Sequence, residues 1–343
     1  MENKYLKWLS SESNSVYWHD SAIRSEQLDA FDNGAVGMTT NPFLINATLR
    51  NDTEFWKDKL QEIPKGLTGD EKVLLLIKCV TGYYADQLMP IFNKKNKGMG
   101  YVCAQTNPSK TGDFQYMVEQ AEIYSQWAPN IVVKLPGTRA GIEACEVCAA
   151  KGISVAITVS FSVSQVLAAG EAFQRGADMA KEKGIEPGLG IAVLMVGRLD
   201  DYLRDVAHDT KSIVTEYDIN HAGTACIKRA YDIFQERGYE AYIMPAGCRN
   251  ADHIVDLAGA NMIMSISPKI TEMIIDEKPD TIKKIDNQVS ADSIKRLLSM
   301  PEFRKAYEPK GLSIDELISF GATNRTTTQF IECGWKPLSE FQY

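Results

Sequence analysis

The sequence predicts an α/β fold, a (β/α)8 TIM barrel. Eight short apolar runs recur along the 343 residues, rich in Val, Ile and aromatic residues and often introduced by Gly or Asn, as strands are. Helical patterns separate most of them, and strand followed by helix, repeated eight times, is typical of a parallel barrel. The eight runs are 16–20, 35–41, 101–106, 130–136, 153–160, 191–197, 240–247 and 261–267.

A doubly wound open sheet is the alternative fold. Such a sheet usually carries a glycine-rich phosphate-binding turn after its first strand. Here the first run continues as 21–25, Ser-Ala-Ile-Arg-Ser, which has no glycine. The Gly-Leu-Gly at 188–190 precedes a strand and lacks the third glycine. The pattern therefore favours the barrel.

Additional helices are expected in two places. The long interval between the second and third runs holds two helical segments, 51–63 and 69–92, and the chain after the eighth run holds two more, 292–307 and 314–321. We expect one barrel domain over 1–343, with 276–343 as a C-terminal helical extension packed on it.

Composition excludes several classes of function. The net charge is −8 and no Lys/Arg-rich stripe is visible, which argues against nucleic acid as a partner. No stretch has the apolar length of a membrane span, and the N-terminal sequence lacks a signal core, so a cytoplasmic protein is expected. The odd number of scattered cysteines, seven, also favours a reducing compartment.

Metal and redox motifs are missing from the sequence. Cys145 and Cys148 form a lone Cys-x-x-Cys without a second ligand pair or a thioredoxin-like context. The four histidines show no metal-binding spacing, and His19 is expected to point away from the lumen. We therefore expect neither a metal nor another cofactor.

Lys134 breaks the apolar pattern of the fourth run, 130–136. Neighbouring side chains of a strand point to opposite faces, so Val133 and Leu135 share a face suited to packing on helices and Lys134 points into the barrel. Lysine is seldom buried unless paired, and burial favours the neutral amine that can form an imine with a carbonyl. A structural ion pair or a side chain reaching to the rim is the alternative interpretation.

Polar side chains close several other runs. Asp20 ends the first, and a carboxylate at the C-terminal end of a barrel strand is placed for catalysis, although an N-cap of the next helix explains it equally well. Gln105 and Asn41 end the third and second runs as neutral hydrogen-bonding groups. Turn chemistry alone accounts for Asn41, because proline follows it.

Two further groups of residues suggest contacts to a small anionic substrate. Thr158 and Ser160 lie on the small, mildly polar face of the fifth run, which suits a lumen holding water or substrate but also a tightly filled core. Arg198 and Arg249 follow the sixth and seventh runs, where barrel loops often bind phosphate, and two arginines can hold one phosphate. A surface ion pair with the aspartates after Arg198 is the alternative.

In their order and spacing, five strings resemble those of the transaldolase family, including its fructose-6-phosphate aldolase branch. The resemblance covers roughly residues 14–270 and is weaker after about 275. The strings are MTTNPFLI (38–45), VVKLPGT (132–138), ITVSFSVSQ (157–165), VGRLDDY (196–202) and IMPAGCRN (243–250).

The resemblance implies catalytic roles for four residues. Lys134 falls where the family has its Schiff-base lysine, and Asp20 matches the acid/base aspartate of the first strand. Thr158 matches the threonine that helps to hold the catalytic water, and Gln105 takes the neighbouring position. The iminium formed on the lysine supplies the electron sink, so the chemistry needs no metal.

The resemblance also implies substrate contacts. Asn41 matches the asparagine that holds a substrate hydroxyl, and Arg198 and Arg249 match the phosphate-binding arginines. Thr39 and Ser160, which lie in the same strings, are further candidates for substrate binding.

Four positions place the chain between the two branches. Transaldolases proper have a glutamate at Gln105, an asparagine at Ala156 and a serine near Val193, whereas the aldolase branch has glutamine and small residues, as here. The aldolase branch carries a tyrosine where Met195 falls, and this chain lacks it.

The implied function is a class I, Schiff-base transaldolase of carbohydrate metabolism and the pentose phosphate pathway. It would be a transferase that moves a dihydroxyacetone unit from a ketose phosphate to an aldehyde. The alternatives are a fructose-6-phosphate aldolase-like lyase, a transaldolase acting on a sulfosugar, and an inactive barrel that binds sugar phosphates. Sugar phosphates or similar anionic sugars are the expected ligands. Because family members commonly self-associate, a homo-oligomer is a further expectation.

Overall fold

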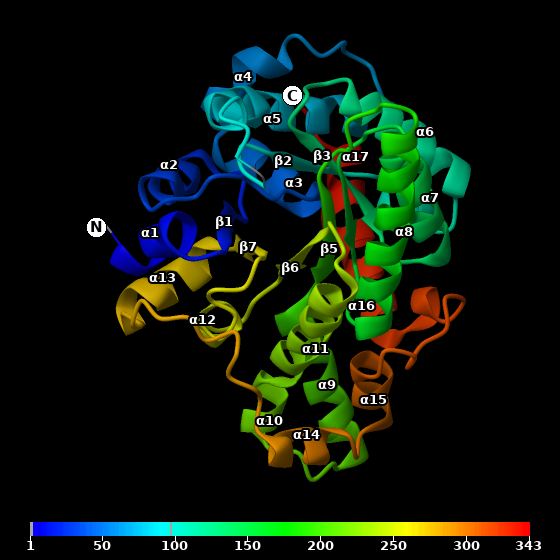
Figure 1. Cartoon of the computed structure of the whole chain (residues 1–343). Coiled ribbons are helices and arrows are strands. Elements are labelled where there is room, and N and C mark those ends of the chain that lie inside the picture. The colour runs from blue at the N-terminus through cyan, green and yellow to red at the C-terminus, as the bar shows by residue number, and fades with distance from the viewer. Residues whose placement is uncertain (1–2, 97) are drawn as a thin grey trace.

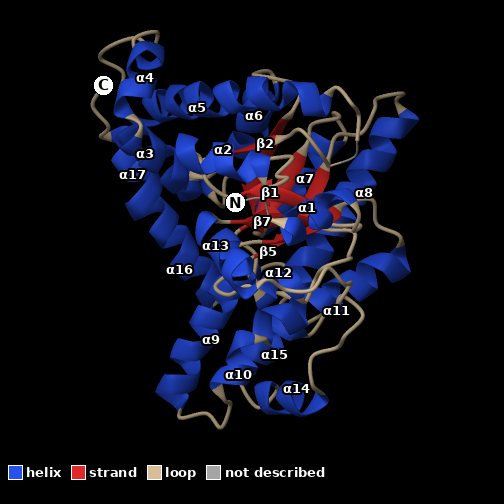
Figure 2. Cartoon of the chain, turned by 90° about the vertical axis from the view of Figure 1, so that its left-hand side faces the viewer, coloured by secondary structure: helices blue, strands red, loops and turns tan. Residues whose placement is uncertain are grey.

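The computed structural model describes residues 3–96 and 98–343 (Figure 1). Its strands are short, buried along their whole length and enclosed by helices (Figure 2). They are β1 (Val16–His19), β2 (Val102–Gln105), β3 (Ile131–Pro136), β4 (Val155–Thr158), β5 (Gly190–Leu194), β6 (Tyr242–Pro245) and β7 (Ile263–Ile266).

All strand pairings that the structure describes are parallel. Strands β2 to β6 are neighbours in chain order, and β7 pairs with β1. Single parallel bridges, His19–Met38 and Met38–Val102, join β1 to β2, and Ile243–Met262 joins β6 to the residue before β7. The eight predicted runs thus follow one another around a ring, and the (β/α)8 prediction is confirmed.

The second run, 35–41, differs from the prediction because it pairs only through Met38. Gly37 lies so close to Trp18 that a Cβ atom would come within 2.4 Å of the indole nitrogen. Directly afterwards Asn41 caps a helix, its Oδ1 accepting the Leu44 N–H at 3.0 Å. The contact of Gly37 with Trp18 and the start of the helix at Asn41 limit this segment on both sides. Only Met38 therefore pairs with the neighbouring strands.

Helices surround the ring (Figure 1). Three of them, rather than the predicted two, fill the interval before β2: the sequence from Pro42 to Asn51 forms a helix that the pattern did not reveal. The helices up to β7 are α1 (Lys4–Ser11), α2 (Arg24–Asp32), α3 (Pro42–Asn51), α4 (Thr53–Leu60), α5 (Gly69–Phe92), α6 (Phe114–Ser125), α7 (Arg139–Ala149), α8 (Val163–Glu182), α9 (Val196–Thr210), α10 (Glu216–Asn220), α11 (Ala222–Arg237) and α12 (Asp252–Val255), with a 3-10 turn, η1 (Pro108–Lys110).

The elements after β7 are α13 (Pro268–Glu277), α14 (Ala291–Leu297), α15 (Pro301–Tyr307), a 3-10 turn η2 (Leu317–Ser319), α16 (Gly321–Phe330), a π-helical turn η3 (Ile331–Trp335) and α17 (Lys336–Ser339). After β7 the chain passes through α13, which lies beside α1, and descends to α14, which contacts α10 and α11 (Figure 1). It then returns to α17, which contacts α5. Within the described residues, none of the helices is both long and apolar enough to cross a membrane.

The predicted helix at 314–321 is wrong, and the real helix lies just beyond it. Glu316 folds the segment into a turn by accepting the Ser313 N–H and hydroxyl at 2.8 and 2.6 Å. The sequence of α16, GATNRTTTQF, is rich in poor helix formers, so tertiary contacts rather than propensity stabilise it. Phe320 packs edge-on against Tyr202 of α9 with ring centroids 5.5 Å apart.

Candidate active site

Lys134 lies in the middle of β3 with only 7% of its surface exposed. Its Nζ donates a hydrogen bond at 3.2 Å to the carbonyl of Thr40. Thr40 follows the Met38 segment, which lies two positions around the ring from β3, so the lysine side chain crosses the lumen as predicted. Gln105 and Ala156 are the register partners of Lys134 on the two flanking strands.

A small pocket opens beside Lys134. The free volume of this pocket is about 10 Å³, which is roughly enough for one water molecule. Gln105 is buried and its Oε1 has no hydrogen-bond partner. The pocket therefore combines an amine, a free buried acceptor and a threonine hydroxyl. Its lining residues are Gln105, Thr106, Asn107, Pro108, Thr111, Lys134, Pro136, Thr158, Val159 and Thr327.

Backbone strain marks the same pocket. Val159 has a φ of 56°, a left-handed conformation that is a genuine outlier for a β-branched residue. Such strain costs about 1–3 kcal/mol and persists where the flanking structure fixes the chain. Here the Thr158 carbonyl accepts the Gly137 N–H at 2.6 Å, and the Ser160 hydroxyl is bonded to the Val193 carbonyl.

Asp20 directly follows β1. Its Oδ1 accepts a hydrogen bond from the Thr39 hydroxyl at 2.7 Å, and that hydroxyl lies 2.8 Å from the one of Ser265. Asp20 is not the N-cap of α2, because Ile23 holds that position without a side-chain bond. Burial raises the pKa of the Cys103 thiol to about 11, while Lys134 lowers it and Asp20 raises it further.

A second pocket, of about 140 Å³, is lined by three arginines. Arg198 lies in the first turn of α9, Arg249 follows β6, and Arg325 comes from α16. Burial and the neighbouring Arg249 lower the pKa of Arg198, whereas Asp20 opposes this shift. The arginine pocket thus lies within electrostatic reach of Asp20. The two pockets are also adjacent, because Thr326 lines this one and Thr327 the pocket of Lys134.

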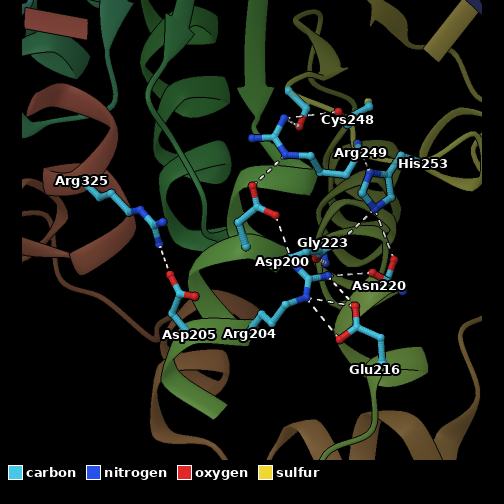
Figure 3. A network of polar contacts seen from close by, with 12 residues as sticks. Asp200, Arg204, Asp205, Glu216, Asn220, Gly223, Cys248, Arg249, His253 and Arg325 are labelled. Atoms are coloured by element: carbon cyan, nitrogen blue, oxygen red, sulfur yellow. Dashed lines mark hydrogen bonds and ion pairs between the residues drawn. The ribbon is translucent and has the colours of Figure 1, made fainter. Parts of the chain in front are cut away.

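Carboxylates of α9 hold two of the arginines in place (Figure 3). Arg249 Nε donates to Asp201 Oδ2 at 2.7 Å, and Arg325 pairs with Asp205. Arg198 instead donates to Gln329 and lies over the Phe330 ring, with 5.3 Å to its centroid. Three guanidinium groups around one small pocket can bind a phosphate or sulfonate by charge-assisted hydrogen bonds.

Known proteins resemble the chain over most of its length. A family model described as Transaldolase/Fructose-6-phosphate aldolase matches residues 17–313. The chain belongs to the transaldolase/fructose-6-phosphate aldolase family. A protein named Transaldolase from Prochlorococcus marinus is 26% identical over 262 residues, which cover 72% of this chain and 71% of that protein.

Two other relatives match shorter parts. Transaldolase 2 of a Nostoc species is 30% identical over 171 residues, which cover 49% of this chain and 45% of the relative. Transaldolase 1 of Streptomyces avermitilis is 29% identical over 208 residues, covering 57% and 54%. The chain thus spans about half the length of these two relatives, and the similarity is to transaldolases in all three cases.

The structure brings the predicted site residues of this transaldolase-family chain into three groups. Lys134, Gln105 and Thr158 line one pocket. Arg198 and Arg249 line the next. Asp20 and Thr39 are hydrogen-bonded to each other.

Two other predicted residues already use their oxygens within the fold. Asn41 Oδ1 caps α3, and the Ser160 hydroxyl bonds the Val193 carbonyl. Asn41 is thus the N-cap of α3, and its contact with a substrate hydroxyl stays a prediction. For Arg198 the alternative of a pair with the following aspartates is wrong, because both have other partners. Asp200 pairs with His253, and Asp201 pairs with Arg249 and Arg204.

Arg325, Gln329 and Thr327 are pocket residues that the sequence did not reveal. All three lie on α16, beyond the last residue of the family match. They end no strand and form no motif, and an arginine in a polar helix is ordinarily a solvated surface residue. Within the part of the chain that the structure describes, no group of three or more His, Cys, Asp or Glu side chains is placed to hold a metal ion.

Proposed function

We propose that the chain is a transaldolase-like transferase that moves a dihydroxyacetone unit from a ketose phosphate to an aldehyde through a Schiff base on Lys134. The observation that carries the proposal is the buried Lys134 amine beside the unpartnered Gln105 oxygen and Thr158, in a pocket that adjoins the three arginines. The family membership of the chain supports the same class of reaction.

The reaction begins with Lys134. Its Nζ attacks the ketone carbon of the sugar, and loss of water gives an iminium. Asp20 then takes the proton of the C4 hydroxyl, through a water held by Gln105 and Thr158. The C3–C4 bond breaks, its electrons pass into the iminium, and the aldehyde phosphate leaves an enamine on Lys134.

Transfer is the reverse process with a second aldehyde. The enamine carbon attacks the aldehyde carbon of the acceptor, and the new alkoxide takes back the proton held by Asp20. Water then hydrolyses the iminium and frees both the new ketose and the lysine. No step requires a redox change, since the electrons lost in bond cleavage return in bond formation.

The anionic end of the sugar is assigned to the arginine pocket. Arg198, Arg249 and Arg325 line its wall, and it lies within electrostatic reach of Asp20. A sulfonate has the same oxygen geometry as a phosphate toward guanidinium groups, so a sulfosugar is an alternative substrate of the same site.

A lyase that releases free dihydroxyacetone is the second candidate. Gln105, the register partner of Lys134, favours it, because the aldolase branch of the family carries a glutamine at this place, whereas transaldolases proper carry a glutamate. The two activities differ in their response to an acceptor: erythrose 4-phosphate accelerates release of the aldehyde phosphate from fructose 6-phosphate by a transferase, whereas a lyase needs no acceptor.

The first test measures that release with and without acceptor. We expect the acceptor to accelerate it, and Lys134→Met to reduce the rate by a factor on the order of 10³ or more, as loss of a nucleophile does. Lys228→Met is the matched control: Lys228 is buried too, but its Nζ binds the carbonyls of Lys284, Ile285 and Asn287. Equal loss in both variants, or wild-type activity in Lys134→Met, would contradict the proposal and favour an inactive sugar-phosphate-binding barrel.

A further inference from the structure

A fully buried carboxylate–imidazole pair lies behind the arginine pocket and has no part in the proposed chemistry. Asp200 of α9 and His253 of α12 are 1% and 0% exposed. Asp200 Oδ2 and His253 Nε2 are 2.8 Å apart (Figure 3). Polar groups buried so completely need a reason, because each must be hydrogen-bonded to avoid a large desolvation cost.

The hydrogen bonds around His253 define its tautomer. Burial lowers the pKa of His253 and the hydrogen bond to Asp200 raises it, with a net rise to about 10. The backbone N–H of Arg249 opposes a second protonation of the ring, because it donates to Nδ1 at 3.1 Å and leaves no room for a proton there. The ring proton therefore lies on Nε2, which donates to Asp200. The other oxygen of Asp200 accepts the Gly223 N–H at 2.7 Å. The chain of bonds thus runs from α9 through the imidazole to the peptide of Arg249, and every member has a partner.

Two other contacts tie the same turn of α9 to the same loop. The Asp201 carboxylate holds the Arg249 side chain at 2.7 Å. Gly197 lies so near that a Cβ atom would come within 2.6 Å of the Gly247 carbonyl and 2.8 Å of the Arg249 nitrogen. Arg198, in this turn of α9, is thereby held at a fixed place relative to both the backbone and the guanidinium of Arg249.

We propose that Asp200 and His253 are positioning residues that set the Arg249 peptide, and with it the spacing of Arg249 and Arg198, for binding of the anionic group of the sugar. The inference rests on the proposed function for the identity of the substrate, but it concerns anion binding alone. Two guanidinium groups bind one phosphate well only when their planes and separation match its oxygens, so a displaced loop weakens binding without touching Lys134.

Asp200→Asn tests the role of the tautomer. The amide has one oxygen where the carboxylate had two, so it cannot accept from both Gly223 and His253. If its nitrogen faces His253, the imidazole must accept at Nε2 and carry its proton on Nδ1, directly against the Arg249 N–H. The asparagine side chain is nearly the same size as that of aspartate. In this orientation it reverses the direction of the hydrogen bond to His253 and so removes the acceptor of the Arg249 N–H.

The primary measurement is the affinity for inorganic phosphate, by calorimetry on the purified full chain. We expect Asp200→Asn and His253→Ala to weaken it at least 10-fold. His253→Asn should recover part of the loss, since its oxygen can accept near the position of Nδ1. KM for fructose 6-phosphate should rise in parallel, whereas borohydride trapping of dihydroxyacetone, which has no anionic group, should keep its wild-type efficiency.

Asp218→Asn is the control for loss of a buried carboxylate. Asp218 is bonded by both Arg296 Nε and Nη2 at 2.7 Å and lies on α10, outside both pockets. It should lower thermal stability while leaving phosphate affinity and KM unchanged. The four histidines also allow the tautomer to be read by nitrogen NMR, and the Nε2–H form of His253 is expected in the wild type.

Wild-type phosphate affinity in folded Asp200→Asn, or an Nδ1–H tautomer in the wild-type protein, would overturn the inference. A wild type that binds no phosphate would overturn it as well. If phosphate affinity falls as expected but no carbonyl compound is ever trapped on the protein, the positioning role stands and the proposed function fails. The two failures are therefore distinguishable.

Discussion

At the scale of single residues, Lys134 was the easiest part of the site to find. It is the one Lys, Arg, Asp or Glu in the seven described strands, so the apolar pattern itself exposes it. The role of Asp20 could not be decided from the sequence, because an aspartate at the end of a strand can equally well be a helix cap or a site residue. The contact with Thr39 and the uncapped start of α2 decide between the two.

Gln105→Leu should separate stability from activity. Its Oε1 is buried without a partner, so an apolar side chain removes an unsatisfied acceptor and should leave stability unchanged or raise it by up to about 1 kcal/mol. Turnover should fall on the order of 10²-fold with little change in KM, because the water needed for proton transfer loses its acceptor. Urea unfolding and steady-state kinetics measure the two effects.

Gln165→Leu is the matched control for that variant. Gln165 is equally buried, but its oxygen accepts the Phe161 N–H at 2.8 Å and its nitrogen donates to the Gly137 carbonyl at 2.8 Å. Loss of these bonds should cost about 2–4 kcal/mol. A similar loss of stability in Gln105→Leu would mean that the Gln105 oxygen is satisfied in solution.

His19 should make the protein less stable in acid. It lies outside the ring, in a cavity that α2 and α13 also line, and neither ring nitrogen has a partner. Burial lowers the pKa of His19 to about 4. Between that value and the unfolded value near 6.5, only the unfolded state binds the proton, so its contribution to stability is full above about pH 6.5 and falls as the pH drops.

His19→Leu isolates this effect. The stability difference between wild type and variant should change by about 2–3 kcal/mol between pH 7 and pH 4.5, because the carboxylates contribute equally to both proteins. Urea unfolding at the two pH values measures it. Parallel stability curves would show that His19 is solvated or paired in solution.

At the scale of elements, buried strands were predictable and the C-terminal helix was not. The predicted apolar runs are five to eight residues long, and all but the second overlap a strand of four to six residues, as a closed parallel ring requires. The segment with Met38 forms only single bridges and no strand, because the contact of Gly37 with Trp18 and the helix cap at Asn41 limit its length. Helix α16 has no apolar periodicity, and its place is set by α9 and by Trp335, whose indole N–H donates to Asp70 at 2.9 Å.

Arg325→Ala tests whether α16 belongs to the anion site. We expect KM for fructose 6-phosphate to rise on the order of 10-fold, as loss of a charge-assisted hydrogen bond does, with little change in kcat. Arg139→Ala is the control, because Arg139 also forms an exposed pair with an aspartate, Asp315, but lines neither pocket. Equal KM values in the two variants would remove Arg325 from the site.

At the scale of the whole molecule, the order of the strands determines the site. Parallel strands present their carboxyl ends at one end of the ring, so residues as distant in sequence as Asp20, Lys134 and Arg249 gather there. Strand number and order were readable from the sequence, and so was this gathering. The adjacency of the two pockets was not, because α16 creates it from outside the repeating pattern.

The most direct test of the Lys134 Schiff base is reduction with sodium borohydride in the presence of fructose 6-phosphate, followed by measurement of the intact mass and by peptide mapping. We expect a reduced three-carbon adduct on the peptide that carries Lys134 and none on the peptide that carries Lys228. An adduct with a different ketose only would keep the mechanism and change the substrate. No adduct with any ketose would contradict the central claim that Lys134 is a Schiff-base nucleophile.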